Sequence, residues 1–287
     1  RERRLMLERR PLQNGERIII GDWASLNVYP SKDGGCKVVF DRPDAPAADA
    51  IASLLDATPS IAKAAKAATG PLEPATDAPA WVGSDESGKG DYFGPLVVAA
   101  VCLTRESWRA LEVLGVRDSK SLSDAAARSL AGQVRETYPA EVVTIGPKRY
   151  NEMWAKMGSV NRVLAWAHAR AIENVLERAP EATAAVADQF GDESLIRDAL
   201  FKKGKAVQLL QMPRAERDPA VAAASIVARA EFLRRLDQLG EQAGLPLPKG
   251  ASEAVEGAAR ALVARLGRDA LPEYAKTHFR TTRRVLA

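Results

Sequence analysis

The sequence predicts an α/β protein preceded by a small α+β domain. Three observations support this: strand-like and helix-like segments alternate after Trp81, short strand-like segments occur within residues 17–40, and a stretch with three prolines and a glycine separates the two regions. Alternating strands and helices are typical of an α/β fold, and such a proline-rich stretch is typical of an extended linker. We therefore predict a first domain at residues 1–68, a linker at 69–80 and a larger domain at 81–287.

The first region has the pattern of a small sheet followed by helices. Residues 26–29 and 36–40 favour strands, and the Asp-Gly-Gly sequence at 33–35 indicates a hairpin turn between them. Glycine accepts the positive φ that a tight turn needs. Residues 47–56 are rich in alanine and favour a helix, and a second helical stretch runs to about Ala68.

The second region alternates between apolar runs and helical spacing. Apolar, β-branched runs predict buried strands, and apolar residues spaced at three and four predict helices. The predicted strands are one ending around Trp81-Val82, then 96–103, 141–145, 182–187 and 207–212. The predicted helices are 160–176 and one that begins at Asp218-Pro219, since aspartate is a good N-cap and proline is tolerated in the first turn.

The charge of the chain permits a polyanionic partner without requiring one. The formal net charge is +4 and the pI about 9.1. Each basic cluster alone fits a solvated surface, but several together favour a groove that follows a phosphate backbone. The clusters are residues 1–10, then Lys202, Lys203 and Lys205, then Lys276, Arg280, Arg283 and Arg284.

Membrane and cysteine-based zinc functions are excluded by the sequence. The N-terminus is charged, and the longest apolar run, residues 96–103, is too short to span a bilayer. The two cysteines, Cys36 and Cys102, have no CxxC spacing, and Cys102 is expected to be a buried small hydrophobe. We expect a soluble, cytoplasmic protein without a membrane partner.

The segment from Gly83 to Pro95 is the most unusual in the chain. The adjacent acids Asp85 and Glu86 suit hard divalent cations, and the Gly-Lys-Gly turn at 88–90 could hold a phosphate. A nucleotide-triphosphate loop would need Ser or Thr at position 90, where this chain has glycine, so we discount an NTPase. A plain surface turn stays open, because these residue types are common in turns.

A third acid, Asp188, ends an apolar strand. A carboxylate at such a position is typical of catalytic groups, although a helix N-cap explains it equally well. Asp192 and Glu193 could join it, or could be ordinary acids of a helix start. Two metal ions would need at least three carboxylates, so this hypothesis requires strands 82–86 and 184–188 to be neighbours.

The two histidines have no local catalytic signature. His168 lies inside the predicted helix on neither a clean core face nor a clean surface face, which favours packing or solvent exposure. His278 lies among basic residues and fits either a nucleic-acid groove or a plain surface position. No GxSxG segment indicates serine hydrolase chemistry.

Residues 85–95 resemble the first signature of type 2 ribonucleases H, and the Asp-Tyr-Phe-Gly-Pro ending is similar to ribonuclease HIII in particular. The resemblance covers residues 81–280. Further similar motifs follow in the same order, at residues 117–122, 188–190, 222–229, 247–251 and 278–279.

This resemblance implies a fold and a site. The expected fold is a ribonuclease H-like mixed sheet flanked by helices, with an N-terminal α+β domain similar to one half of a TATA-box-binding protein that helps bind the substrate. The implied metal-binding catalytic residues are Asp85, Glu86 and Asp188, holding two divalent ions, Mg²⁺ or Mn²⁺. The fourth carboxylate is assigned to Asp192, with Glu193 in reserve. The implied substrate-binding residues are Ser87, Gly88, Lys89, Gly90 and Lys120.

The implied function is endonucleolytic hydrolysis of the RNA strand of RNA/DNA hybrids by two metal ions, leaving 5′-phosphate and 3′-hydroxyl ends. We expect the hybrid as partner and a monomeric protein. One alternative is ribonuclease HII-like incision at single ribonucleotides in duplex DNA; Tyr92-Phe93 and the N-terminal module argue against it. Another is a hybrid-binding protein without catalysis, against which the complete set of acids argues.

Overall fold

The chain divides into two units, residues 1–67 and 68–287. The computed structural model describes the backbone of residues 7–12, 15–20, 24–30 and 36–40 in the first unit. In the second unit it describes residues 72–116, 122–188, 193–200 and 203–287, with only the backbone of Glu193.

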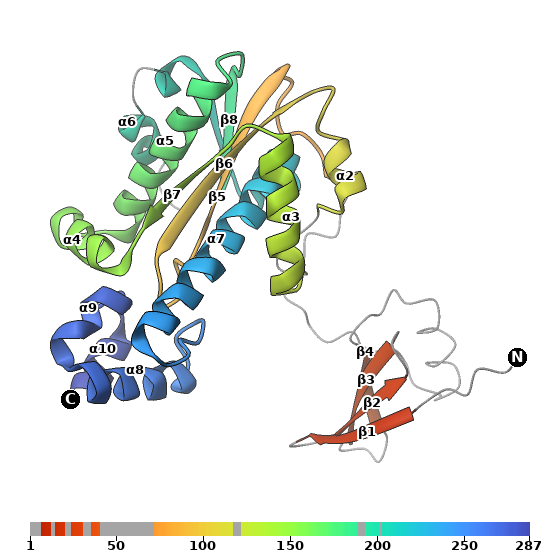
Figure 1. Cartoon of the computed structure of the whole chain (residues 1–287). Helices are drawn as coiled ribbons and strands as arrows, with labels where there is room; N and C mark the ends of the chain where they lie inside the picture. The colour runs from red at the N-terminus through yellow and green to blue at the C-terminus, as the bar shows by residue number, and fades with distance from the viewer. Residues whose placement is uncertain are drawn as a thin grey trace, which may run out of the picture. The chain divides into compact units, whose positions relative to one another are not determined.

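The first unit contains a four-stranded antiparallel sheet in the order β1-β2-β3-β4, drawn in red in Figure 1. The strands are β1 (Leu7–Leu12), β2 (Gly15–Ile20), β3 (Ala24–Pro30) and β4 (Cys36–Phe40). Pro30 pairs with Cys36, so β3 and β4 flank the predicted hairpin turn. The turn residues 33–35 and the predicted helices at 47–56 and up to Ala68 lie outside the described residues.

The second unit is built on a five-stranded mixed sheet in the order β7-β6-β5-β8-β9 (Figure 1). Its strands are β5 (Ala80–Ser87), β6 (Leu96–Thr104), β7 (Ala140–Ile145), β8 (Ala184–Asp188) and β9 (Gln208–Met212). Strands β5, β6 and β7 pair antiparallel, whereas β5, β8 and β9 run parallel. The predicted mixed sheet is confirmed.

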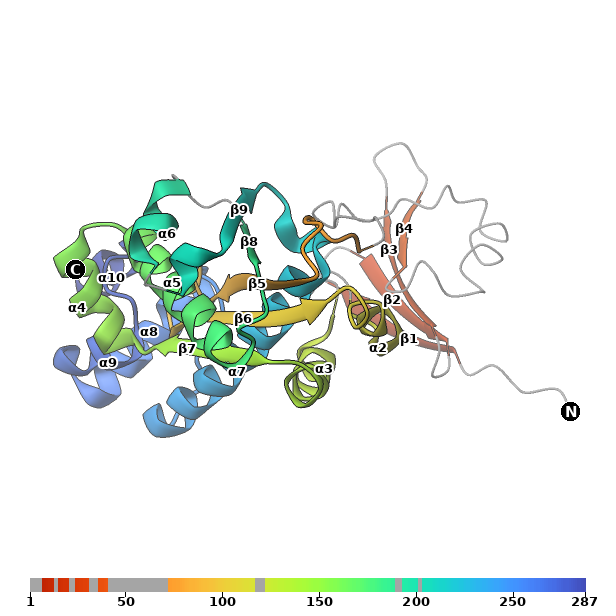
Figure 2. The same cartoon turned by 90° about the horizontal axis from the view of Figure 1, so that it is seen from above.

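Helices cover both faces of this sheet, as Figures 1 and 2 show. On one face, α7 (Pro219–Ala243) packs across β5 and β6 and α3 (Asp124–Thr137) packs on α7. On the other face lies α5 (Val160–Arg178). Alternate residues of β6 belong to two separate hydrophobic clusters, one on each face. Burial on both faces explains why residues 96–103 form an unbroken apolar run.

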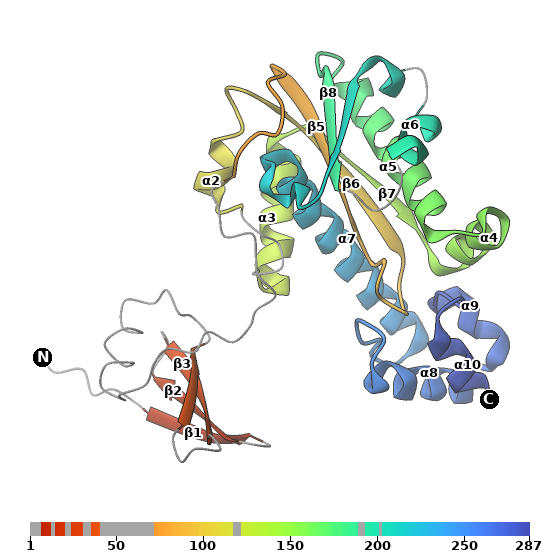
Figure 3. The same ribbon diagram turned by 180° about the vertical axis from the view of Figure 1, so that it is seen from behind.

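The remaining elements lie around this three-layer core. Helices α8, α9 and α10 gather at the end of the unit near the C-terminal end of α7 (Figure 3). The other bounds are α2 (Ala110–Leu114), α4 (Pro147–Met157), α6 (Glu193–Ala199), α8 (Glu253–Leu266), α9 (Leu271–Tyr274) and α10 (Arg280–Leu286), with short 3₁₀ turns η2 (Gly204–Ala206), η3 (Ala215–Arg217) and η4 (Arg268–Ala270).

The start of α7 is fixed tightly against β5. Asp218 caps the helix as predicted, accepting hydrogen bonds from the backbone N–H groups of Ala220 and Val221 at 2.9 and 3.2 Å. It also accepts a bond from the Trp81 indole at 3.1 Å. A Cβ atom at Gly83 would lie 2.2 Å from the backbone carbon of Ala220, so only glycine permits this approach.

Two sequence expectations need correction. Strand β5 does not end around Trp81-Val82 but pairs with β6 as far as Ser87, so Asp85 and Glu86 are strand residues. Lys276, assigned to a basic surface cluster, has 0% exposure. Among the described residues, no helix is both long and apolar enough to cross a membrane.

Candidate active site

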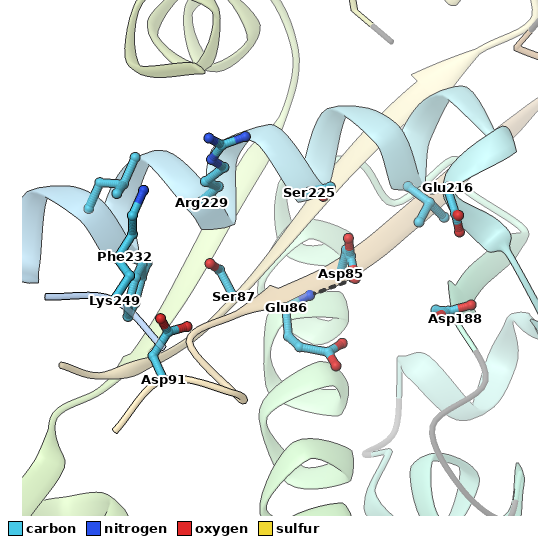
Figure 4. A pocket seen from close by; sticks show the side chains of 12 residues that line it. Asp85, Glu86, Ser87, Asp91, Asp188, Glu216, Ser225, Arg229, Phe232 and Lys249 are labelled. Atoms are coloured by element: carbon cyan, nitrogen blue, oxygen red, sulfur yellow. Dashed lines mark hydrogen bonds between the residues drawn. The ribbon is translucent and has the colours of Figure 1, made fainter. Parts of the chain in front are cut away.

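A cavity of about 510 Å³ opens where β5 and β8 end beneath α7. Figure 4 shows the side chains that line it. They are Asp85, Glu86, Ser87, Asp91, Asp188, Glu216, Val221, Ser225, Arg229, Phe232, Leu233 and Lys249. Acids and bases from β5, β8, the turn η3, helix α7 and the segment before α8 therefore share one pocket.

Sheet pairing brings the predicted acids together. Ser84 of β5 is in register with Ala187 of β8, and the next residue on each strand is an acid, Asp85 and Asp188. The two strands run parallel, so both acids lie at the same edge of the sheet. The adjacency that the metal hypothesis requires is present.

Asp85 and Glu86 leave β5 on opposite faces, because successive side chains of a strand alternate. Asp85 lies on the α7 side near Ser225, and its Oδ1 accepts the Glu86 backbone N–H at 2.8 Å. Glu86 lies on the α5 side, where its Oε2 is 3.2 Å from His168 Nε2 and its Oε1 is 3.4 Å from Lys89 Nζ.

These surroundings shift the pKa values of the two acids in opposite directions. Burial, followed by the charge of Glu86 and a smaller contribution from Asp188, raises the pKa of Asp85 to about 7 against the hydrogen bond from Ser225. Burial also raises the pKa of Glu86, but the bond and charge of His168, together with Lys89, outweigh it and leave that pKa below its ordinary value. The charges that raise the pKa of Asp85 are those of the acids Glu86 and Asp188, whereas the pKa of Glu86 is lowered by His168 and Lys89.

A further acid, Glu216, lines the same pocket and was missed by sequence reasoning. The preceding residue, Ala215, donates its backbone N–H to Asp188 Oδ1 at 3.3 Å, which fixes the turn η3 beside β8. The pairing of Asp188 with Met212 of β9 brings this turn there. Recognising β9 as the parallel neighbour of β8 was the signal that could have found Glu216.

Three sequence-predicted residues cannot be placed in the pocket. Asp192 and Lys120 lie outside the described residues. Glu193 begins helix α6, but its side chain is also outside what the structure describes. The assignments of Asp192 and Lys120 stay predictions.

The glycine-lysine turn follows β5 directly. Gly88 has φ +89°, and a Cβ atom there would lie 2.2 Å from the Pro95 carbonyl oxygen, so the turn requires glycine. Gly90 has no atom within 4 Å of its Cβ position and is exposed, which leaves its backbone accessible. The Lys89 side chain is 39% exposed.

The rest of the signature is internal packing. Tyr92 and Phe93 have 0% exposure and pack edge to face at 5.0 Å between ring centroids. The buried Lys276 ammonium donates to the Gly94 carbonyl at 2.6 Å and lies 3.4 Å from the carbonyl oxygens of Phe93 and Pro95. These residues act as a frame for the turn and have no surface for contact with a ligand.

Two cations that the sequence did not single out as binding residues also line the pocket. Arg229 and Lys249 both pair with Asp124, at 2.7 Å each. In Figure 4 they lie on the opposite side of the view from Asp85, Asp188 and Glu216. The acid Asp91 lies on the same side of the view as these two cations.

The histidines depart from the simple expectations. His168 has 0% exposure, as the packing alternative stated, but it also contacts Glu86. His278 stacks on Trp154, with 5.2 Å between ring centroids and an interplanar angle of 20°, so it lies neither in the pocket nor freely on the surface. Cys102 is buried as predicted, with 2% exposure.

The donor set of the pocket suits a hard divalent cation, because its acids offer oxygen ligands, and burial together with neighbouring negative charge raises the pKa of one of them, Asp85. Within the described ranges, no three Asp, Glu, His or Cys side chains already converge on one point. Glu86 is bonded to His168, and Asp188 to Ala215.

Comparisons with known proteins agree with this architecture. A family model described as Ribonuclease HII matches residues 82–282. Ribonuclease HIII of Protochlamydia amoebophila (strain UWE25) is 42% identical over 205 residues, covering 71% of this chain and 68% of that protein. Ribonuclease HIII of Chlamydia pneumoniae is 42% identical over 202 residues, covering 70% and 68%.

Solved structures extend the similarity to nearly the whole chain. The structure of Bst-RNase HIII in complex with Mn²⁺ matches with a TM-score of 0.67 and 30% identity, covering 98% of this chain and 92% of that one. Aquifex aeolicus RNase H3 matches with a TM-score of 0.58 and 23% identity, over 95% and 91%, which shows the fold alone.

The matched segment contains every residue that lines the pocket, and this sheet with its acidic edge is that of a type 2 ribonuclease H. Within that class, the chain belongs to the ribonuclease HIII family. It is a metal-dependent endoribonuclease that hydrolyses the RNA strand of RNA/DNA hybrids.

Proposed function

We propose that the pocket beneath α7 is where this hydrolysis takes place, with Asp85, Glu86 and Asp188 as the metal ligands. The observation that carries the proposal is the meeting of these acids at the parallel edge of β5 and β8. Asp192 stays the proposed fourth carboxylate, with Glu193 in reserve, and Glu216, which lines the same pocket, is a further candidate.

The bound ions would be Mg²⁺ or Mn²⁺, and a relative in this family has been solved with Mn²⁺. Asp85, Glu86 and Asp188 would hold two such ions, which would activate a water and stabilise the leaving 3′-oxygen, giving 5′-phosphate and 3′-hydroxyl ends. By binding the metal ions, the acids of the pocket would keep positive charge next to the scissile phosphate. The donors Lys89, Arg229 and Lys249 are available to neutralise neighbouring phosphates once they exchange their present carboxylate partners.

The substrate strand would pass over the turn after β5. The exposed backbone of Gly90 and the pocket-lining hydroxyl of Ser87 offer hydrogen-bond donors to it, and Gly88 sets the path of the turn. RNA is distinguished from DNA by contacts to the 2′-hydroxyl. Lys120 is retained as a substrate-binding residue from the sequence.

For the whole chain we propose the division predicted from the sequence: a substrate-binding domain at 1–68, a linker at 69–80 and the catalytic domain at 81–287. The similarity of nearly the whole chain to Bst-RNase HIII supports an N-terminal domain of the same kind. We also propose a cytoplasmic monomer. Light scattering of the full chain with and without hybrid tests the oligomeric state.

The test compares two labelled duplexes in Mg²⁺ or Mn²⁺: a long RNA/DNA hybrid, and duplex DNA with one ribonucleotide. We expect cleavage mainly of the hybrid, with 5′-phosphate ends. Preferred incision at the single ribonucleotide would favour the ribonuclease HII-like alternative. Tight binding without cleavage of either would favour the non-catalytic binder.

The site assignment is tested by Asp85→Asn. Loss of an outer partner of a metal ligand lowers activity by about 10- to 100-fold, so loss of the ligand itself should exceed about 100-fold. The nearly isosteric amide keeps the shape of the pocket, and thermal unfolding checks the fold. Full metal-dependent cleavage by this variant would refute the assignment.

A further inference from the structure

A buried hydrogen-bonded chain leads from the core to one of the proposed metal ligands. Ser84 Oγ lies 2.9 Å from His168 Nδ1, and His168 Nε2 lies 3.2 Å from Glu86 Oε2. Ser84 and Glu86 are two residues apart on β5 and so point to the same face, towards α5. His168, on α5, spans the gap between them.

The chemistry of Glu86 fixes the direction of this chain. A carboxylate only accepts hydrogen bonds, so Nε2 of His168 donates to Glu86. The other ring nitrogen, Nδ1, bonds to the Ser84 hydroxyl, which can donate to a neutral ring and accept from a protonated one. In both states Ser84 holds the ring so that the Nε2–H points at the carboxylate.

The positions of these groups leave the ring little freedom. Ser84 and His168 both have 0% exposure, and the Glu86 side chain is only 14% exposed. Water has no access to either ring nitrogen, and a buried donor without a partner costs about 1–3 kcal/mol. The ring is thereby confined to the orientation that serves Glu86.

We infer that His168 is a positioning residue, which holds one oxygen of Glu86 and so orients the carboxylate for the divalent ion. With Oε2 bonded to His168, Oε1 is the oxygen turned towards Lys89 and the turn after β5. Partners of this kind orient metal ligands, and their loss commonly lowers metal affinity by about 10- to 100-fold. The inference rests on the proposed function, because it takes Glu86 to be a ligand.

Two amide variants separate this role from simple packing. In His168→Gln, the amide nitrogen occupies nearly the place of Nε2 and keeps a donor for Glu86. In His168→Asn, the shorter side chain puts its amide near the place of Nδ1, next to Ser84, and cannot reach Glu86. Both variants put a polar amide of similar bulk into the same buried site.

The measurement is direct binding of Mn²⁺ to the full chain without nucleic acid, followed by the loss of the electron paramagnetic resonance signal of free Mn²⁺. We expect His168→Asn to weaken binding by roughly tenfold or more. His168→Gln should stay close to the wild type. Cleavage of the hybrid by His168→Asn should recover as Mn²⁺ is raised, since the reacting groups are intact.

A matched control lies on the same helix. Glu173 of α5 is buried and accepts the Gly204 backbone N–H at 2.7 Å, but it does not line the pocket. Glu173→Ala should lower thermal stability and leave Mn²⁺ affinity unchanged. If His168→Asn does not fold, Ser84→Ala gives the test instead, since it frees the ring and should weaken Mn²⁺ binding to a smaller extent.

Glu86→Gln distinguishes failure of the inference from failure of the proposed function. Wild-type Mn²⁺ affinity in Glu86→Gln would overturn the ligand assignment itself. Weak binding by Glu86→Gln but normal binding by His168→Asn would overturn only the role of His168. Equal weakening by His168→Asn and His168→Gln would also overturn it, because packing alone would then explain the loss.

Discussion

Asp85 and Glu86 are neighbours on one strand, yet they have opposite environments. Asp85 lies under α7, where burial and the charge of Glu86 raise its pKa to about 7. Glu86 lies over α5, where His168 and Lys89 bring its pKa below the ordinary value despite burial. Strand alternation alone separates the two by placing each against a different helix.

The difference shows how the site combines stability with reactivity. Glu86 is ionised before any ligand arrives, because the fold already supplies its donors. Ionisation of Asp85 lowers the stability of the folded state unless a positive charge is added nearby. A bound divalent ion would supply that charge. The protein thus stabilises the ionised form of Glu86, whereas the metal ions would stabilise the ionised form of Asp85.

The largest expected effect comes from removing the close approach of α7. Gly83→Ala puts a Cβ atom 2.2 Å from the backbone of Ala220 and must shift the helix away from β5. We expect destabilisation on the order of 3 kcal/mol, the upper range for overpacking. Urea unfolding measures this, and the pKa of Asp85 should fall as water enters.

Gly90→Ala is the matched control, because nothing lies within 4 Å of its Cβ position. Its stability should stay within about 0.5 kcal/mol of the wild type. If Gly83→Ala were as mild, the close approach would not be what buries Asp85.

The second prediction concerns stability against pH in metal-free protein. The folded state binds a proton at Asp85 more strongly than the unfolded state, so the stability from Asp85 is present below about pH 4 and is lost as pH rises through about 7. Asp85→Asn should therefore gain stability relative to the wild type over this window. The difference can change by at most about 1.4 kcal/mol per pH unit.

Glu86→Gln should show the opposite sign. The lowered pKa of Glu86 contributes stability above pH 4.5, the ordinary value, and loses it as pH falls through the folded-state pKa. The variant should therefore be less stable than the wild type near pH 7, and the gap should shrink in acid. Urea titrations in EDTA at several pH values measure the free energy of unfolding of both variants. If it changed with pH in the same direction for both variants, relative to the wild type, the comparison would be contradicted.

The smallest expected effect is that of Ser225→Ala. The Ser225 hydrogen bond lowers the pKa of Asp85, so its removal should raise that pKa further. One hydrogen bond of about 1 kcal/mol corresponds to roughly 0.7 pH unit. The pH at which Mn²⁺ binding reaches half its maximum should move up by that amount, whereas Glu173→Ala, outside the pocket, should leave it unchanged.

Local patterns in the sequence predicted most of the sheet and three of the pocket acids. Asp85 and Glu86 stand out as adjacent acids followed by a Gly-Lys-Gly turn, and Asp188 because it ends an apolar strand. Their meeting could not be predicted, since the pairing of Ser84 with Ala187 joins strands about a hundred residues apart and depends on the whole fold. The resemblance to ribonuclease HIII, and not the local pattern, indicated that these three acids form one metal site.

The errors have physical causes. Glu216 lies in a short 3₁₀ turn, which has no periodic pattern, and only the neighbouring strands bring it to Asp188. Lys276 was placed on the surface because lysine is almost never fully buried, yet carbonyl oxygens surround its ammonium. His168 was weighed only by helix face, which says nothing of a partner on another element.

The buried contacts of Lys276 with the segment after β5 affect when the site can form during translation. Its ammonium bonds to Gly94, 182 residues earlier in the chain, and its backbone N–H to Tyr92. At about 5–20 residues per second, a ribosome needs roughly 10–40 s to synthesise the intervening stretch. During that interval the nascent chain already contains Asp85 and Glu86 but lacks the contacts of Lys276. The active site is therefore completed only late in translation.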